Sequence, residues 1–138
     1  DLCRRLLVEK PDERPQVRAP ADAANVVMSE MSVLEQEHLV VLLLDTKNRV
    51  LAQSTVYKGS LNTSLIRVGE LFREAIRANC ASLIVIHNHP SGDPAPSDTD
   101  IAMPKEVQQA CQALGLVLHD HIILGAGREV SLRGRGDF

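Results

Sequence analysis

A short apolar run that ends in two histidines constrains this chain more than any other feature of its sequence. Residues 83–86 read Leu-Ile-Val-Ile, which predicts a buried strand. His87 and His89 follow directly, and side chains two positions apart on an extended chain point the same way. We therefore expect both imidazoles to face one point in space at the end of this strand.

The residues after the histidines predict a stiff loop and then a helix. Three prolines and one glycine between positions 90 and 96 exclude regular structure there. Ser97 is suited to the N-cap of a helix, with Asp98 and Asp100 in its first turn. Asp100 can then approach the two imidazoles. Two imidazoles and one carboxylate leave one tetrahedral position open for water, which is the arrangement of a catalytic zinc.

Each of these residues also has a purely structural interpretation. A His-x-His at the end of a strand can be two surface histidines, or one histidine satisfied in a core. Ser97 as a helix cap would stabilise the helix by roughly 1 kcal/mol without any catalytic role. The two roles are compatible, because a cap residue can also present its hydroxyl to a site. Asp93 and Asp98 are interpreted as loop and helix-start carboxylates.

The order of the predicted elements indicates an α/β fold in one domain. The first twenty residues are charged and contain prolines, which predicts a linker or the tail of a preceding region, with a helical tail suggested by Leu2, Leu6 and Leu7. Residues 21–138 form the domain. Helices are expected at 21–34, 65–79 and 98–114, and strands at 39–44, 49–57, 83–86, 116–124 and 129–132. This order fits a mixed sheet with helices on its faces.

Composition limits the classes of partner. The chain of 138 residues has a net charge of -3, which argues against a broad phosphate-binding surface for nucleic acid. Its three cysteines fit neither a zinc knuckle nor a disulfide framework, which favours a reducing cytoplasm. No signal peptide or membrane-spanning run is visible, so we expect a cytoplasmic protein without membrane contact. Because the first residue is Asp, we expect a fragment of a longer chain.

The spacing of the motif resembles that of a known family. His87-x-His89, seven residues, Ser97, two residues and Asp100 is similar to the JAMM motif of MPN-domain metalloproteases. The wording His-Asn-His-Pro-Ser-Gly-Asp-Pro resembles the bacterial RadC family more closely still, over residues 22–134. Further matches are Glu37 before a strand, Gly59-Ser60-Leu61-Asn62, and Asp120-His121-Ile122-Ile123. The resemblance implies the MPN fold, a deaminase-like three-layer α/β architecture with a mixed sheet and flanking helices.

The resemblance also implies roles for individual residues. It implies one zinc ion per chain on His87, His89 and Asp100, with Glu37 as the general base. Glu35 is the competing carboxylate. Ser97 would donate to the oxyanion that develops when an amide carbonyl is attacked.

Asp120 and His121 also match the RadC pattern. They could accept hydrogen bonds from metal-bound histidines, and a satisfied core pair is the equal alternative. One departure is Gly69, where RadC relatives usually carry an arginine, which puts an anion or substrate contact there in doubt.

The predicted function is a zinc metallopeptidase of the JAMM type that cleaves peptide or isopeptide bonds in a peptide or protein substrate. Two alternatives stay open, a non-catalytic MPN interaction module and an accessory factor in DNA repair. The acidic balance gives the second no support within this segment. A zinc deaminase is excluded because its Pro-Cys-x-x-Cys ligand pair is absent from the sequence. The sequence leaves the substrate and the oligomeric state open.

Overall fold

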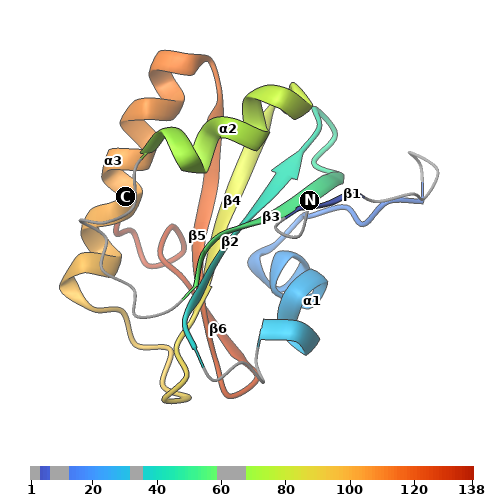
Figure 1. Cartoon of the computed structure of the whole chain (residues 1–138). Helices are drawn as coiled ribbons and strands as arrows, with labels where there is room; N and C mark the ends of the chain where they lie inside the picture. The colour runs from blue at the N-terminus through green and yellow to red at the C-terminus, as the bar shows by residue number, and fades with distance from the viewer. Residues whose placement is uncertain (1–3, 7–12, 32–35, 59–67) are drawn as a thin grey trace.

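The chain forms a mixed β-sheet with helices on both faces (Figure 1). The computed structural model describes residues 4–6, 13–31, 36–58 and 68–138. Within these ranges the sheet has six strands in the order β1-β3-β2-β4-β5-β6. The elements are β1 (Arg4–Leu6), α1 (Pro20–Met31), β2 (His38–Leu44), β3 (Val50–Lys58), α2 (Val68–Ala78), β4 (Ser82–Asn88), α3 (Asp98–Leu114), β5 (Val117–Gly125) and β6 (Arg128–Ser131).

Alternation along the central strands divides the core into two layers. The residues 39–44 of β2 are all apolar and buried. Odd-numbered positions of β2 from 39 to 43 pack with α2 and α3, and even-numbered positions from 40 to 44 pack with α1. Figure 1 shows α2 and α3 on one side of the sheet and α1 on the other. The expected strand covered on both faces, the α/β class and the three-layer arrangement are confirmed.

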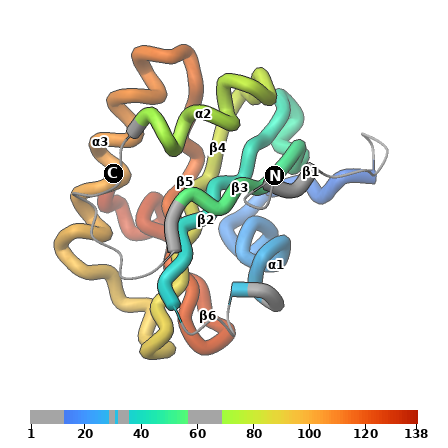
Figure 2. The backbone as a smooth tube through the Cα atoms, in the orientation of Figure 1, coloured from blue at the N-terminus to red at the C-terminus, as the bar shows by residue number. Residues whose placement is uncertain are grey.

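The topology places β4 in the middle of the sheet. It pairs antiparallel with β2 and parallel with β5, and the other strand pairs are antiparallel. A parallel neighbour needs a crossover connection, which α3 supplies. Figure 2 shows β2, β4 and β5 running together through the centre of the molecule. The histidine motif therefore lies where the most deeply buried strand leaves the sheet.

Within the described residues the three helices agree with their expected bounds to within one residue, while positions 32–34 and 65–67 of the expected helices lie outside those residues. Helix α3 spans the expected residues and ends at Gly115, whose φ of 72° is left-handed. The apolar side chains of Ile76 in α2 and Leu114 in α3 are 61% and 49% exposed. Ile76 lies about a quarter turn from the centre of the apolar stripe of α2, and Leu114 is the last residue of α3. Met103 is buried instead, one helical turn before Val107.

The chain before residue 21 contributes to the sheet. Arg4–Leu6 is a strand that pairs with β3, so the expectation of a helical tail is wrong at these residues. The pairing covers backbone groups of β3 that would otherwise form an open edge. Val17 is buried against α1, and Gln16 forms an isolated bridge with Arg49. Of the helices in the described ranges, none is long and apolar enough to cross a membrane.

Two further features expected from the sequence lie outside the described residues. These are Glu35 and the segment Gly59-Ser60-Leu61-Asn62.

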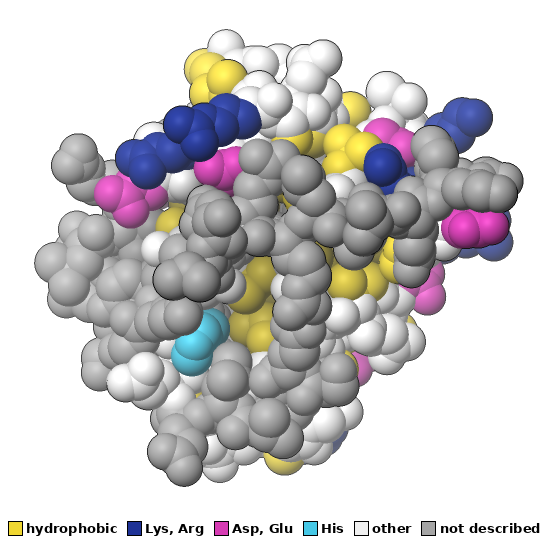
Figure 3. Space-filling model, turned by 45° about the vertical axis from the view of Figure 1, so that its right-hand side comes forward, with side chains coloured by type: hydrophobic (Ala, Val, Ile, Leu, Met, Phe, Trp, Pro, Cys, Tyr) yellow, Lys and Arg dark blue, Asp and Glu magenta, His cyan; other side chains and the backbone are white. Residues whose placement is uncertain are grey.

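On the face shown in Figure 3, basic and acidic side chains of the described residues lie next to one another along the upper edge.

The loop after β4 packs tightly against the end of β5. The backbone N–H of His89 donates to the carbonyl of Leu124 at 2.7 Å. A Cβ added at Gly125 would lie 2.8 Å from the carbonyl oxygen of Gly92 and 2.9 Å from the nitrogen of Pro94. Both atoms are backbone, so neither can rotate away. Gly125 therefore permits the close approach that supports the loop between the histidines and α3.

We predict that Gly125→Ala lowers the free energy of unfolding by about 1 to 3 kcal/mol, because the added methyl overpacks a rigid contact. Denaturant unfolding measures the change when the wild type and the variant are fitted with the same dependence of unfolding free energy on denaturant concentration. Gly69→Ala is the matched control, because a Cβ there meets nothing within 4 Å. In an exposed helix position this control should gain stability, by up to about 1 kcal/mol. A Gly125→Ala protein as stable as the wild type would contradict the prediction.

Candidate metal centre

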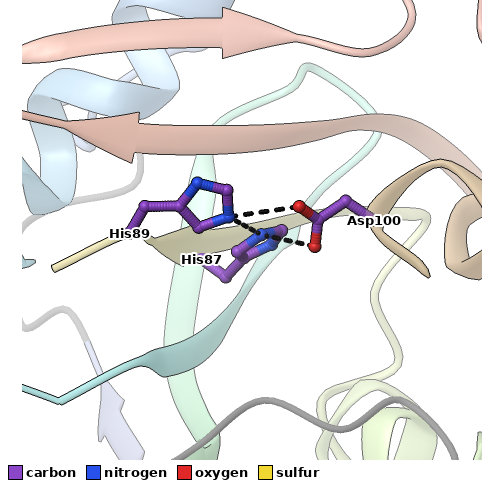
Figure 4. Close-up of side chains that lie close together, drawn as sticks. All are labelled: His87, His89 and Asp100. Atoms are coloured by element: carbon purple, nitrogen blue, oxygen red, sulfur yellow. Dashed lines mark hydrogen bonds and ion pairs between the residues drawn. The ribbon is translucent and has the colours of Figure 1, made fainter. Parts of the chain in front are cut away.

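Three side chains converge where β4 ends and α3 begins (Figure 4). Nε2 of His87 and Nε2 of His89 are 3.2 Å apart. His87 Nε2 lies 3.0 Å from Oδ1 of Asp100, and His89 Nε2 lies 3.1 Å from Oδ2 of the same carboxylate. His87 is fully buried and Asp100 is 3% exposed. The structure thus brings together the two histidines and the aspartate that the spacing indicated.

A capping box at the start of α3 holds the aspartate. Ser97 has the extended backbone of an N-cap, and its Oγ accepts from the backbone N–H of Asp100 at 3.2 Å. In return, Oδ2 of Asp100 accepts from the backbone N–H of Ser97 at 2.8 Å. The predicted cap is confirmed. Asp100 has a second role that the sequence did not indicate, because one carboxylate both caps the helix and faces the imidazoles.

Backbone and side-chain partners set the orientation of both imidazoles. Nδ1 of His89 lies 2.9 Å from the carbonyl oxygen of Asp93, and a carbonyl only accepts, so Nδ1 carries the hydrogen. Nε2 of His89 then keeps its lone pair toward the cluster. Nδ1 of His87 lies 2.7 Å from Nε2 of His121. With Nδ1 of His87 as the donor to His121, Nε2 is the ring nitrogen that faces Asp100.

The environment sets the protonation of the neighbouring groups. The pKa of His121 lies well below its usual value. Complete burial is the main cause, and the charge of His87 lowers the pKa further. His121 is therefore neutral at pH 7 and can accept from His87. Burial alone would raise the pKa of Asp100, but hydrogen bonds from His87 and Ser97, with the charge of His87, bring that pKa well below its usual value. The cluster presents an ionised carboxylate.

The donor set fits a divalent metal ion. One ligand atom from each of His87, His89 and Asp100 lies within 4.8 Å of the others. Two imidazole nitrogens and one carboxylate oxygen are three ligands of a tetrahedral site with one position open. Each imidazole has a partner on its other ring nitrogen, as metal-bound histidines usually do. The cluster could therefore bind a metal ion.

A hollow of about 260 Å³ opens beside the cluster. Glu37, half-buried immediately before β2, shares its lining with Ser97 and Asp100. His89 also lines it, with Pro90, Ser91 and Thr99. Glu37 and Asp100 are 63 positions apart, and the antiparallel pairing of β2 with β4 brings their segments to one end of the sheet. Both expected catalytic residues therefore share a hollow with two of the expected ligands.

His121 and Asp120 turn out to have different surroundings. His121 contacts His87 and makes edge-to-face ring contact with it. Asp120 instead accepts from the hydroxyl of Ser131 and from the backbone N–H groups of His121 and Arg133. It also lines a separate hollow of about 300 Å³ next to the start of α1. Of the two residues, His121 is the one that supports the cluster.

Two supporting groups were missed by the sequence analysis. The backbone carbonyl of Asp93 orients His89, whereas its side chain was interpreted as a loop carboxylate. Asn88, between the two histidines, is 2% exposed and bonds backbone groups on either side of Glu37. Its position between the histidines was the available signal. Its partners depend on how β2 approaches β4, which no local pattern shows.

Comparison with known proteins identifies related sequences. The family model described as "RadC-like JAB domain" matches residues 17–137. A UPF0758 protein of Roseiflexus castenholzii is 52% identical over 136 residues, which cover 99% of this chain and 58% of that protein. UPF0758 proteins of Chloroflexus aurantiacus and Bacillus cereus are 52% and 46% identical over 136 residues each.

The chain spans about three fifths of the length of these curated relatives, between 58% and 60%. The family model covers most of the chain, and its matched range includes every member of the site from Glu37 to His121. The chain therefore belongs to the RadC-like JAB domain family.

Proposed function

We propose that this domain is a zinc-dependent hydrolase that cleaves a peptide or isopeptide bond in a peptide or protein substrate. One observation carries the proposal. A candidate general base, a hydroxyl and two groups of a metal-binding donor set line one hollow, although they come from separate parts of the chain. Such a convergence of polar groups is typical of hydrolytic sites.

His87, His89 and Asp100 would hold the zinc ion. When bound, zinc would supply Lewis-acid chemistry and lower the pKa of a water ligand to about 7. The ring partners of the histidines, His121 and the carbonyl of Asp93, would keep both Nε2 atoms directed at the position that the ion would occupy. The capping box keeps the aspartate carboxylate in place.

Glu37 would move the proton. Its carboxylate takes a proton from the attacking water and returns it to the leaving amine, which lets one residue act as base and then acid. Its position in the lining of the hollow, beside His89 and Asp100, supports this role. Glu35 lies outside the described residues, so the structure supplies no competing geometry for it.

Ser97 would stabilise the oxyanion. Its Oγ accepts from the Asp100 N–H through a lone pair and lies 3.0 Å from Oγ1 of Thr99. The hydroxyl hydrogen is therefore not needed for the cap and can be donated to a developing oxyanion. Ser97 is exposed at the rim of the hollow, where a substrate carbonyl would enter.

A non-catalytic interaction module and a DNA-repair accessory factor are the competing proposals. Neither role requires the buried imidazole of His87 to contact the buried carboxylate of Asp100. Burying two such groups carries a substantial desolvation penalty. A bound cation would compensate that penalty. The buried donor set therefore favours the hydrolase over both alternatives.

We predict that the wild-type chain binds one Zn²⁺ per chain and that Asp100→Asn weakens binding sharply. The amide keeps an oxygen that can accept from the Ser97 N–H, so the helix cap survives while the anionic ligand is lost. Metal analysis and competition with a chromogenic chelator measure affinity. At a free Zn²⁺ concentration of 100 times Kd, the wild type should gain about 2.7 kcal/mol of stability.

Asp98→Asn is the matched control for the metal prediction. Asp98 is an exposed carboxylate in the same helical turn, and it is not a member of the cluster. This variant should retain wild-type affinity for Zn²⁺. Equal zinc content in the wild type and in a His87→Ala/His89→Ala variant would show that the metal assignment is wrong.

We predict that Glu37→Gln keeps fold and zinc but lowers hydrolysis by about 10² to 10⁴-fold, because an amide cannot accept the proton. The assay is cleavage of a peptide library by the zinc-loaded chain, with products identified by mass spectrometry and Asp100→Ala as the inactive reference. Glu106→Gln, an exposed change on α3, is the control and should be fully active. Wild-type turnover in Glu37→Gln would exclude Glu37 as the base.

We predict that Ser97→Asp is folded, stable and zinc-bound but inactive. Aspartate can cap α3, yet it places negative charge where negative charge develops. Ser97→Ala should lose roughly 1 kcal/mol of stability with the cap and about 100-fold or more in turnover. Thermal unfolding, zinc content and turnover of both variants separate the two effects. An active Ser97→Asp enzyme would reduce Ser97 to a helix cap.

A further inference from the structure

Asn88 is a buried polar side chain in an unusual place. It is the last residue of β4, lies between the two histidines, and is 2% exposed. Ile84 and Ile86 of the same strand pack on the α1 side, so strand alternation sends Asn88 to that side and His87 to the other. An amide without partners at such a depth would be strongly destabilising. Its hydrogen bonds are therefore part of the explanation for its presence.

Both partners of the amide are backbone groups next to Glu37. Oδ1 of Asn88 accepts from the backbone N–H of His38 at 2.7 Å. Nδ2 donates to the carbonyl oxygen of Gln36 at 3.0 Å. An N–H can only donate and a carbonyl can only accept, so one orientation of the amide satisfies both groups. The side chain thus holds the residue before Glu37 and the residue after it.

This contact replaces the strand pairing that ends at the same point. Leu39 pairs with His87, and one step further along an antiparallel ladder His38 would face Asn88. The side chain of Asn88 takes the His38 N–H instead, and reaches Gln36 as well. Nδ1 of His38 also lies 2.9 Å from the Gln36 carbonyl. The backbone around Glu37 is therefore held at two atoms by one planar group.

The constraint acts on the direction of the Glu37 side chain. The φ and ψ angles of a residue set the direction of its Cα–Cβ bond, and here the peptide groups on both sides are held. A carboxylate that transfers protons has to lie within hydrogen-bonding reach of its partner, and a displacement of about 1 Å can lower a rate by on the order of 100-fold. Asparagine suits this task because it has a donor and an acceptor side by side.

We propose that Asn88 is a positioning residue that aims the Glu37 carboxylate into the hollow. This inference rests on the proposed hydrolase function, in which Glu37 is the base. Asn88 touches neither substrate nor metal in this scheme. It acts through the backbone, so its loss should reduce turnover while leaving zinc affinity and KM unchanged.

Asn88→Asp is the primary variant, because it keeps the size and the acceptor but removes the donor to Gln36. Asn88→Ser is the second variant, because its hydroxyl is too short to bridge both groups. Asn48→Asp is the matched control. Asn48 lies in the turn at the other end of β2, and its Oδ1 bonds Nε2 of His119 at 2.9 Å. It should behave as the wild type in every measurement.

The test is a double-mutant cycle on the zinc-loaded chain with the best-cleaved peptide of the library. Asn88→Asp should lower kcat by on the order of 100-fold, with KM and zinc affinity within about twofold of the wild type. In the Glu37→Gln background the same change should lower residual turnover by less than about twofold, because the group being aimed is already disabled.

A second readout does not depend on activity. Exchange of the His38 backbone amide, followed by NMR, should become faster in Asn88→Ser in both metal-free and zinc-loaded protein. The amides of residues 40–44 should stay protected, since their partners are strand backbone. Unchanged His38 exchange would overturn the clamp itself.

The outcomes separate this inference from the hydrolase proposal. A wild type that cleaves no peptide, or a Glu37→Gln variant as active as the wild type, removes the hydrolase scheme and this inference with it. An inactive Glu37→Gln beside a fully active Asn88→Asp overturns the inference alone. Equal losses in both backgrounds, loss of zinc, or failure of both Asn88 variants to fold would assign Asn88 to the fold or the metal instead.

Discussion

The carboxylate of Asp100 is the point at which the fold and the site depend on each other. It accepts from the Ser97 N–H to close the capping box of α3, and it contacts both imidazoles. A helix start and a metal-binding cluster thus share one group. Because burial alone would favour its neutral form, the hydrogen bonds that keep it ionised decide whether the cluster presents a negative ligand. Moving the start of α3 would therefore move the site.

Neighbouring residues at the end of β4 point to opposite faces of the sheet and contact different groups. Alternation sends His87 toward α3, where it meets Asp100 and His121. The next residue, Asn88, points to the α1 side and bonds the backbone entering β2. One strand end therefore contributes His87 to the cluster and, through Asn88, holds the backbone around the candidate base. The tight contact of the following loop with Gly125 keeps this strand end in register with β5.

Much of the fold follows from local pattern. The continuous apolar run at 39–44 predicts a strand buried on both faces, and the structure has α1 on one face with α2 and α3 on the other. The span of α3, its cap at Ser97 and its end at Gly115 also follow from local chemistry. The strand at Arg4–Leu6 did not, because its pairing with β3 is non-local and three residues carry little periodic signal.

The sequence by itself determined the donor set, because a two-residue histidine spacing, a rigid loop and a capped helix leave few positions for Asp100. It also placed Glu37 before a buried strand. Only the tertiary structure decided which groups support these residues. Three contacts show this. His121, and not Asp120, lies beside His87; the carbonyl of Asp93 lies beside Nδ1 of His89; and Asn88 bonds the backbone next to Glu37. All three depend on how separate strands and loops meet. Such contacts are set by sheet register and loop packing, which local residue patterns do not encode.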